Sequence, residues 1–458
     1  MSLESLLNPG IRTILVKGDP GTGKTILAFE LLRRYGRGTY LSSRVSEEKT
    51  LKHYPEVRAL LKEGKVTVAK RVTRAKFEDI VLADAATVIE SVLKSISKSK
   101  EPLVVLDSWD TIAKELDRVE RMKTEKALVA MADAQKARLV FISEEPSSTS
   151  VDYAVDAIIT LKDEMHDGRR VRRMEWNKLR GSDIPQKSYL FSLFGARFNL
   201  FNHMETKLPQ GYKPRLFRPI KNSNGLYSTG SKDLDALLGG GMKKGSRILL
   251  ELGKYLGSDW HLPLMSSISC NFLLNGGCNA LIPTSGLIPE SAKESRAGHL
   301  PKQIVENSLR IGHFGDTSSD DPCFFKLDPN SISKTYDMFF KEAERIRSHP
   351  GDDSGARRHC LFGVGVDRLE AIFGDEVLGQ YYPRGAAATR LGGDVAILIA
   401  KHSTKSNDKL ADLVDAYLKL DEIDGALVIY ALKPPSRIYH VQYDYGRGYP
   451  DVRLTPLA

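Results

Sequence analysis

The chain has 458 residues and a net charge of +9, with 27% charged and 41% hydrophobic residues, which is typical of a globular protein and excludes a disordered or fibrous chain. Its apolar runs, such as residues 395–400, are far shorter than the roughly 18 residues of a membrane span. Without a signal-peptide pattern, and with four cysteines that lack zinc or disulfide-scaffold spacing, we expect a cytoplasmic protein that does not enter a membrane.

The positive charge lies in the first half of the chain. Residues 1–225 hold 40 Lys and Arg against 29 Asp and Glu, whereas the remainder is close to neutral. A basic half favours an acidic ligand or partner: a nucleotide, a nucleic acid or an acidic protein surface. A solvated basic surface without any ligand is the alternative.

Short apolar runs alternate with amphipathic stretches from residue 11 onward. We predict strands at residues 11–17, 39–42, 66–69, 103–106 and 138–143. Helices are predicted between them, including 25–35, 78–97 and 110–136. This alternation predicts a parallel sheet with helices on both faces. From residue 157 the pattern changes to hairpins, with a turn at Asp167 and Gly168.

A second series of elements begins at residue 227. Its predicted strands are residues 247–251, 280–282, 360–366, 394–400 and 426–430, and the polar stretch 290–355 is predicted to be a partly irregular insertion. Residues 202–226 contain three prolines and no hydrophobic period, which predicts a linker. The repeated order favours a duplicated domain, with domains at 1–201 and 227–458.

A glycine-rich motif joins the first predicted strand to the first predicted helix. Residues 18–25 read Gly-Asp-Pro-Gly-Thr-Gly-Lys-Thr and fit the P-loop pattern G-x-x-x-x-G-K-[ST]. In such a loop the backbone N–H groups surround nucleotide phosphates, the lysine reaches the β- and γ-phosphates, and the final hydroxyl binds Mg²⁺. The sequence therefore predicts an ATP site in which Lys24 is also catalytic and Thr25 binds Mg²⁺. The predicted site consists of Gly18, Asp19, Pro20, Gly21, Thr22, Gly23, Lys24 and Thr25.

Three further charged residues suit a P-loop site. Asp107 follows the apolar residues 103–106, where a carboxylate holds the Mg²⁺ of such sites, although a strand ending in Asp also commonly starts a turn. Lys178 and Arg180 lie two residues apart in a predicted strand and therefore share a face. They could clamp a γ-phosphate as an arginine finger does, or they could be two solvated cations on an edge strand.

With these motifs the chain resembles a tandem KaiC-type ATPase of the RecA superfamily, and within it the archaeal GvpD-like branch of regulators, named for gas-vesicle gene control. The resemblance rests on the P-loop, residues 103–108, Lys178-Leu-Arg-Gly181, and residues 227–246 with their Ser-Thr-Gly and Leu-Leu-Gly-Gly-Gly segments. It implies two RecA-like P-loop-type domains, each a mostly parallel twisted sheet with helices on both faces and a terminal β-hairpin region. It also implies a homo-oligomer, a ring or a dimer, in which Lys178 and Arg180 reach the neighbouring subunit's ATP.

The first departure from the resemblance concerns hydrolysis. KaiC-type domains carry paired glutamates after the second strand, and one of them activates the attacking water. Here Arg44 and Val45 occupy the matching positions, and Glu47 and Glu48 lie three positions later. We therefore expect slow turnover, with Glu47 as a substitute catalytic base or as no more than a favourable charge at a helix start.

The second departure concerns the second half. Aligned from Gly253, Ser258 replaces the second P-loop glycine, Asp259 the lysine and Trp260 the Ser/Thr. A carboxylate repels phosphate, and an indole offers Mg²⁺ no ligand. The sequence thus predicts a second domain that no longer binds ATP in the ordinary way, with Asp367 as the counterpart of Asp107.

Three functions compete at this point. We favour an ATP-dependent regulatory switch that acts through assembly or partner binding. A DNA-acting ATPase is the second, because four arginines at the tip of a predicted hairpin could contact phosphates, although no stacking aromatics accompany them. Those arginines are Arg169, Arg170, Arg172 and Arg173. A scaffold that binds ATP without hydrolysing it is the third.

Overall fold

The chain forms two compact units. The computed structural model describes residues 2–42, 52, 66–69, 75–76, 79–80, 85–97, 100–114, 116–204, 208–223, 225–315, 321–348 and 357–457. One unit comprises Met1–Asn202 with Pro456–Ala458, and the other comprises His203–Thr455. Within the described ranges, no helix combines the length and apolar character that crossing a bilayer requires.

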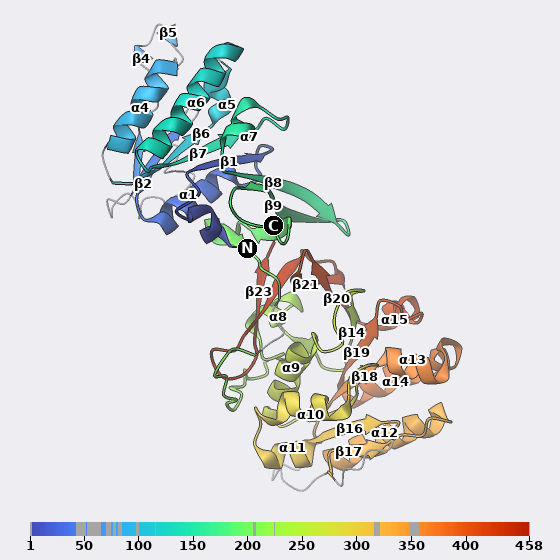
Figure 1. Ribbon diagram of the computed structural model, residues 1–458. Helices are drawn as coiled ribbons and strands as arrows, with labels where there is room; N and C mark the ends of the chain where they lie inside the picture. Colours follow the sequence, from blue (N-terminus) through green and yellow to red (C-terminus); the bar gives the residue numbers. More distant parts are fainter. Residues whose placement is uncertain are drawn as a thin grey trace. The chain divides into compact units, whose positions relative to one another are not determined.

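The first unit is built on a nine-stranded sheet in the order β11-β10-β9-β8-β1-β7-β6-β2-β3 (Figure 1). Its strands are β1 (Thr13–Gly18), β2 (Gly38–Ser42), β3 (Val66–Ala69), β6 (Leu103–Asp107), β7 (Arg138–Ser143), β8 (Ala157–His166), β9 (Arg169–Leu179), β10 (Ser188–Ser192) and β11 (Asn199–Leu200), with β4 (Ala75–Lys76) and β5 (Asp79–Ile80) paired separately. Its helices are η1 (Leu3–Leu7), α1 (Lys24–Tyr35), α4 (Ala85–Ser97), α5 (Trp109–Ala113), α6 (Arg118–Ala134), α7 (Ser150–Ala154) and η2 (Phe194–Ala196).

The central strands of this sheet are parallel and buried on both faces, as their continuous apolar sequences predict. Ile14 and Val16 of β1 pack in one core with Leu27 and Leu31 of α1. Leu15, which alternates with them, faces the opposite core with residues of α4, α5, α6 and α7. Each buried aliphatic side chain contributes about 1.5–3 kcal/mol relative to exposure. The sheet becomes antiparallel from β8 to β11, and Asp167 and Gly168 form the predicted turn between β8 and β9.

The second unit contains a ten-stranded sheet in the order β17-β16-β15-β18-β19-β14-β20-β21-β22-β23. Its strands are β14 (Arg247–Leu252), β15 (Cys278–Ile282), β16 (Leu309–His313), β17 (Phe324–Lys326), β18 (Cys360–Gly365), β19 (Val395–Lys401), β20 (Ala416–Ile423), β21 (Ala426–Lys433), β22 (Tyr439–Asp444) and β23 (Asp451–Pro456), with β12 (Leu226–Tyr227) paired to β13 (Met242–Lys243). Its helices are α8 (Lys232–Leu237), α9 (Leu262–Leu274), α10 (Pro289–Ala297), α11 (Lys302–Ser308), α12 (Ile332–Arg347), α13 (Val366–Phe373), α14 (Asp375–Gly392) and α15 (Asn407–Leu413).

The two sheets share one strand order. The run β3-β2-β6-β7-β1-β8-β9-β10 of the first unit corresponds to β16-β15-β18-β19-β14-β20-β21-β22 of the second. Helix α9 follows the central strand β14 as α1 follows β1, and it packs on one face of the sheet. Helices α12 to α15 pack on the other face (Figure 1). The prediction of tandem RecA-like α/β folds with helices on both faces is confirmed.

Two predictions of local structure were wrong. Residues 110–136 are not one helix, because Asp117 caps a new helix by accepting bonds from the backbone N–H of Val119 and Glu120. The helix predicted at 78–97 begins only at Ala85. The described part of 290–355, predicted as a partly irregular insertion, includes most of α10, all of α11 and α12, and the strands β16 and β17.

The segment predicted as a linker packs along the second unit where it is described. The Phe217 side chain is buried, and its backbone N–H donates to the carbonyl of His299. The backbone N–H of Ile220 donates to Asn271 Oδ1 at 2.7 Å. Proline-rich composition therefore marks an extended segment here, and backbone groups of that segment form hydrogen bonds to helix α9 and to the loop after α10.

Candidate functional site

The loop between β1 and α1 carries the P-loop motif, as the sequence predicts. Gly23 precedes the helix with φ 103°, a conformation that L side chains rarely adopt. A Cβ at this position would also lie 2.8 Å from the Leu193 side chain. The loop thus ends at the N-terminus of α1, where free backbone N–H groups and the helix dipole favour an anion.

Lys24 turns back into this loop. Its ammonium donates to the carbonyl oxygens of Gly18 at 2.6 Å and Asp19 at 2.8 Å, and the side chain is 7% exposed. The hydroxyl of Thr22 also donates to the Asp19 carbonyl, which closes the loop on itself. A buried ammonium enclosed by backbone groups is the arrangement that suits a lysine serving phosphate oxygens.

Thr25 and Asp107 meet beside the loop. The Thr25 hydroxyl donates to Asp107 Oδ2 at 2.8 Å, and the hydroxyl of Tyr40 donates to the same oxygen. Parallel pairing of β6 with β7 and of β7 with β1 brings Asp107 to the edge of the sheet at which the loop lies. Oxygen ligands of this kind suit Mg²⁺, which keeps several waters and takes few protein ligands. The residues therefore fit Mg²⁺ at the positions that the sequence predicts, although the described residues include no cluster of three or more acidic, His or Cys side chains that could hold a metal unaided.

Glu144 is a site residue that the sequence reasoning missed. It directly follows β7, and its Oε1 lies 3.9 Å from Lys24 Nζ. Its backbone N–H donates to Asp110, whose other carboxylate oxygen accepts from Ser143 Oγ at 2.8 Å. An available signal was overlooked, because Glu144 follows an apolar strand just as Asp107 does.

Arg172 is the second missed residue. Its side chain is only 7% exposed, and Nη1 donates to the carbonyl of Gly21 in the P-loop at 3.1 Å. Burial is the largest influence on its pKa and lowers it, and the neighbouring Arg170 adds to this effect. The sequence reasoning placed Arg172 among cations at a hairpin tip, but strand β9 turns it toward the loop.

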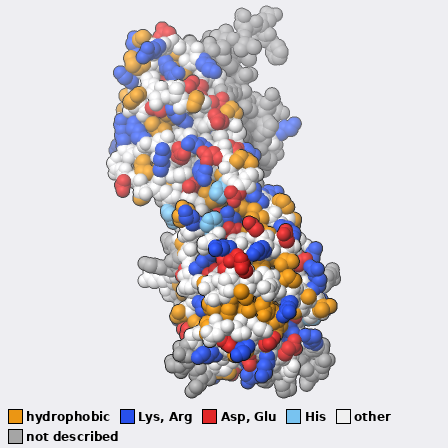
Figure 2. Space-filling view, turned by 90° about the vertical axis from the view of Figure 1, so that its right-hand side faces the viewer, with side chains coloured by type: hydrophobic (Ala, Val, Ile, Leu, Met, Phe, Trp, Pro, Cys, Tyr) orange, Lys and Arg blue, Asp and Glu red, His pale blue; other side chains and the backbone are white. Residues whose placement is uncertain are grey.

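The hairpin arginines do not form a free basic patch. Arg170 pairs with Asp163, Arg173 pairs with Glu164, and Arg169 donates to the Asp167 carbonyl. Figure 2 shows basic and acidic side chains interspersed over the viewed face of the molecule. These pairs remove much of the charge that would attract a nucleic-acid backbone.

Lys178 and Arg180 both reach the C-terminal end of α7. Lys178 Nζ donates to the carbonyls of Asp152 at 2.9 Å and Tyr153 at 3.2 Å, while Arg180 donates to the Tyr153 carbonyl and contacts Asp156. Burial, followed by the charge of Arg180, lowers the pKa of Lys178. Cations at a helix C-terminus stabilise the helix, so these residues have a structural role whether or not they also contact a nucleotide.

The substitute base considered from the sequence cannot be placed. Glu47 lies outside the described residues, as do Glu48, Arg44 and Val45. Its role as a catalytic residue stays a prediction.

The corresponding loop of the second unit lacks these features. The carboxylate of Asp421 packs directly against Gly253, and Trp260 lies against the core, its carbonyl accepting from the Tyr443 hydroxyl at 3.0 Å. Asp367 is not the counterpart of Asp107 that the sequence predicted. When the two sheets are compared with Gly18 matched to Gly253, the strand register puts Val366 at the position equivalent to Asp107, and Asp367 follows one residue later.

Comparison with known proteins agrees with this geometry. Residues 7–177 match the family described as the GvpD gas vesicle protein, P-loop domain. The chain is 27% identical to the protein GvpD2 of Halobacterium salinarum, over 98% of this chain and 94% of that protein, and 23% identical to GvpD1 of the same organism, over 97% and 94%. It is 27% identical to the circadian clock oscillator protein KaiC of Rippkaea orientalis, over 52% of this chain and 47% of that protein. The resemblance inferred from the motifs is confirmed: the chain is related to the GvpD proteins over nearly its whole length and to KaiC over about half of it.

Proposed function

We propose that the first unit binds ATP with Mg²⁺ and hydrolyses it slowly, and that the nucleotide state regulates assembly of the chain or its binding to a partner. The observation that carries the proposal is the enclosed ammonium of Lys24, 2.6 and 2.8 Å from two loop carbonyls, beside the Thr25–Asp107 pair. The relationship to GvpD and KaiC proteins supports a P-loop ATPase of the KaiC/RecA type.

In this proposal each residue has a defined task. Lys24 exchanges its carbonyl partners for β- and γ-phosphate oxygens, and the backbone N–H groups of residues 18–25, apart from Pro20, which has none, hold the remaining phosphate charge. Thr25 and Asp107 hold Mg²⁺, which neutralises charge on the phosphates. Arg172 keeps the loop in shape through the Gly21 carbonyl.

We assign the activation of water to Glu144. A carboxylate 3.9 Å from the Lys24 ammonium lies next to the place where a γ-phosphate would bind, within reach of an attacking water. Glu47 stays the alternative base. Lys178 and Arg180 bond to helix α7 of their own unit, so they act on a γ-phosphate only in trans, when a second copy of the chain supplies them.

Titration calorimetry of the full chain with ATP, with and without Mg²⁺, tests the binding proposal. The native chain should bind one ATP more tightly when Mg²⁺ is present. Asp107→Asn should remove this gain while ATP still binds, because the phosphate cradle is intact. An ATP affinity of the native chain that is the same with and without Mg²⁺ would contradict the proposed site.

Light scattering with and without ATP tests the switch. A change in mass upon ATP addition supports a homo-oligomer controlled by the nucleotide. An unchanged mass, together with ATP-stimulated capture of an acidic protein, would favour the partner-binding form of the proposal. Salt-dependent DNA binding would favour the DNA-acting ATPase, which the paired hairpin arginines do not support. ATP binding without phosphate release would favour the scaffold that binds ATP without hydrolysing it. The cytoplasmic location stays a prediction.

A further inference from the structure

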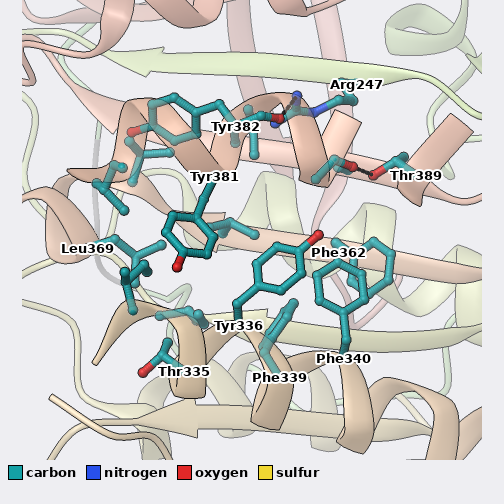
Figure 3. A pocket seen from close by; sticks show the side chains of 18 residues that line it. Arg247, Thr335, Tyr336, Phe339, Phe340, Phe362, Leu369, Tyr381, Tyr382 and Thr389 are labelled. Carbon is teal, nitrogen blue, oxygen red and sulfur yellow. Dashed lines mark hydrogen bonds between the residues drawn. The ribbon is translucent and has the colours of Figure 1, made fainter. Parts of the chain in front are cut away.

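A cavity in the second unit lies between one face of its sheet and helices α12, α13 and α14 (Figure 3). Its volume is about 100 Å³, the same order as the ~150 Å³ apolar cavity known to take up one benzene molecule. Its lining includes no residue of the P-loop-like segment 253–260. It is therefore separate from the place where the first unit's nucleotide site would have its counterpart.

Aromatic side chains make up much of the wall. Six of them converge from three elements, namely Tyr336, Phe339 and Phe340 of α12, Phe362 of β18, and Tyr381 and Tyr382 of α14. Ring centroids of Tyr336 and Tyr381 lie 5.8 Å apart, and those of Phe340 and Phe362 lie 5.3 Å apart. These are the separations at which aromatic rings attract one another, so another flat ring would find the same contacts here.

Arg247 is the one charged side chain among the described residues that line the cavity. It is 5% exposed, its Nη1 donates to the Tyr382 carbonyl at 3.1 Å, and its Nε has no partner in the described part of the chain. Figure 3 shows it at the end of the cavity bounded by Tyr382 and Thr389. Burial lowers the pKa of Arg247, and the charge of Asp415, which accepts from the Arg247 backbone N–H, opposes this effect only in part. Asp415 forms its ion pair with Arg390, and no ion pair joins the Arg247 guanidinium to a carboxylate within the described residues. A buried cation without a direct carboxylate partner is costly.

We propose that this cavity binds a monocyclic aromatic carboxylate, with its ring among the aromatic side chains and its carboxylate against Arg247. The planar guanidinium matches a carboxylate in shape, and a single negative charge balances a single buried cation. A phosphate group would bring more charge than one guanidinium neutralises. The mainly apolar wall favours one ring over a sugar or a peptide backbone, because the few hydroxyl groups of its tyrosines and threonines cannot satisfy so many polar groups.

Calorimetry of the full chain with benzoate and with the neutral analogue benzyl alcohol tests the proposal. Benzoate should bind saturably with one site per chain and raise the melting temperature. Benzyl alcohol should bind at least tenfold more weakly, because it brings no charge to Arg247. The absence of saturable benzoate binding, or equal affinity for both compounds, would overturn the proposal.

Two leucine substitutions in helix α14 locate the site. A Cβ added at Gly385 or at Gly379 meets no atom within 4 Å, but only Gly385 lines the cavity. Gly385→Leu should therefore fill the cavity and weaken benzoate binding at least tenfold, whereas Gly379→Leu should leave it unchanged. Equal effects of the two substitutions would place benzoate elsewhere and contradict the proposal.

A third variant tests the charge. Arg247→Gln keeps a donor for the Tyr382 carbonyl while it removes the cation, so benzoate should lose its advantage over benzyl alcohol. A benzoate preference that survives this substitution would overturn the role of Arg247. Melting temperatures of all variants show whether each one is folded.

Discussion

The two units arrange their strands in the same order, yet they distribute charge around the central loop in opposite ways. In the first unit the loop carries Lys24, and the residue after β7 is the acidic Glu144. When Gly18 is matched to Gly253, Ser143 stands level with Lys401 and Glu144 with His402. The second unit thus has Asp259 where the first has Lys24, and it has Lys401 and His402 at the end of the neighbouring strand.

This difference shows that the fold and the ligand chemistry depend on different residues. The shared order depends on apolar strands buried on both faces, and the loop charges do not take part in that burial. In the second unit Lys401 donates to the Ser285 carbonyl and lies 3.5 Å from Asp367, so the ammonium at the end of this strand already has partners within the unit. A duplicated domain can therefore lose one ligand site without losing its sheet.

The largest effect is expected from substituting Lys24, which stands where the second unit has Asp259. Lys24→Ala should abolish measurable ATP binding, because this ammonium is the fixed cation that the loop offers to the β- and γ-phosphates. Calorimetric titration with Mg²⁺ and ATP measures the loss. Lys17→Ala is a useful control, because Lys17 precedes the loop and pairs with Asp152. Unchanged ATP affinity in Lys24→Ala would contradict the site.

Glu144→Gln should separate turnover from binding. Removing a general base lowers turnover by about 10²–10⁴-fold, while ATP affinity should hold or improve because a negative charge beside the phosphates is removed. Phosphate release at saturating ATP, paired with titration, gives both values. The neighbouring Glu145→Gln is the matched control, since Glu145 bonds to Ser147 instead. If Glu144→Gln retains full turnover, the base lies elsewhere, and Glu47→Ala becomes the decisive variant.

Alanine at Lys178 or Arg180 should lower turnover at least tenfold and affect ATP affinity much less. The second unit again differs, because the strand registers of the two sheets put Ala431 at the position equivalent to Lys178. Because the proposed action is in trans, specific activity should rise with protein concentration until assembly saturates.

The contacts of Lys178 and Arg180 with α7 call for a control on stability. Melting temperatures of the alanine variants separate a loss of helix stabilisation from a loss of catalysis. Native activity that does not vary with protein concentration would rule out action in trans.

The smallest effect is expected from repairing the loop of the second unit. In a Lys24→Ala background, Asp259→Lys with Trp260→Thr should not restore ATP binding. Asp421 still packs against Gly253, and Val366 offers no carboxylate where Asp107 would stand. Calorimetry with Mg²⁺ and ATP checks this, and tight binding would mean that two residues alone separate the units.

Much of this molecule could be predicted because its strongest signals are local. Continuous apolar runs gave most central strands, and the P-loop spacing gave Lys24 and Thr25. Glu144 and Arg172 reach the loop only through the pairing of β7 with β1 and of β9 with β8, and strand order cannot be read from spacing. The break before α6 did have a local signal, because Asp117 and Glu120 form a capping box.

Polar composition hid the structure of residues 290–355. Helix α12 buries Phe339, Ala343 and Ile346 at helical spacing while its other face stays polar. A count of polar residues therefore suggested a partly irregular insertion, although the period of the apolar residues indicated a helix at this place.

The hydrogen bonds of Lys24 to the loop carbonyls have a consequence for recognition. A lysine side chain has about 2 kcal/mol of rotamer entropy to lose, and the enclosure of Lys24 by Gly18 and Asp19 means that folding has already restricted it. An arriving phosphate therefore meets a cation that is ordered in advance and exchanges one set of oxygen partners for another. Recognition at this loop is preorganised, so the selectivity of the exchange depends on how much better a charged phosphate oxygen serves the ammonium than a neutral carbonyl does.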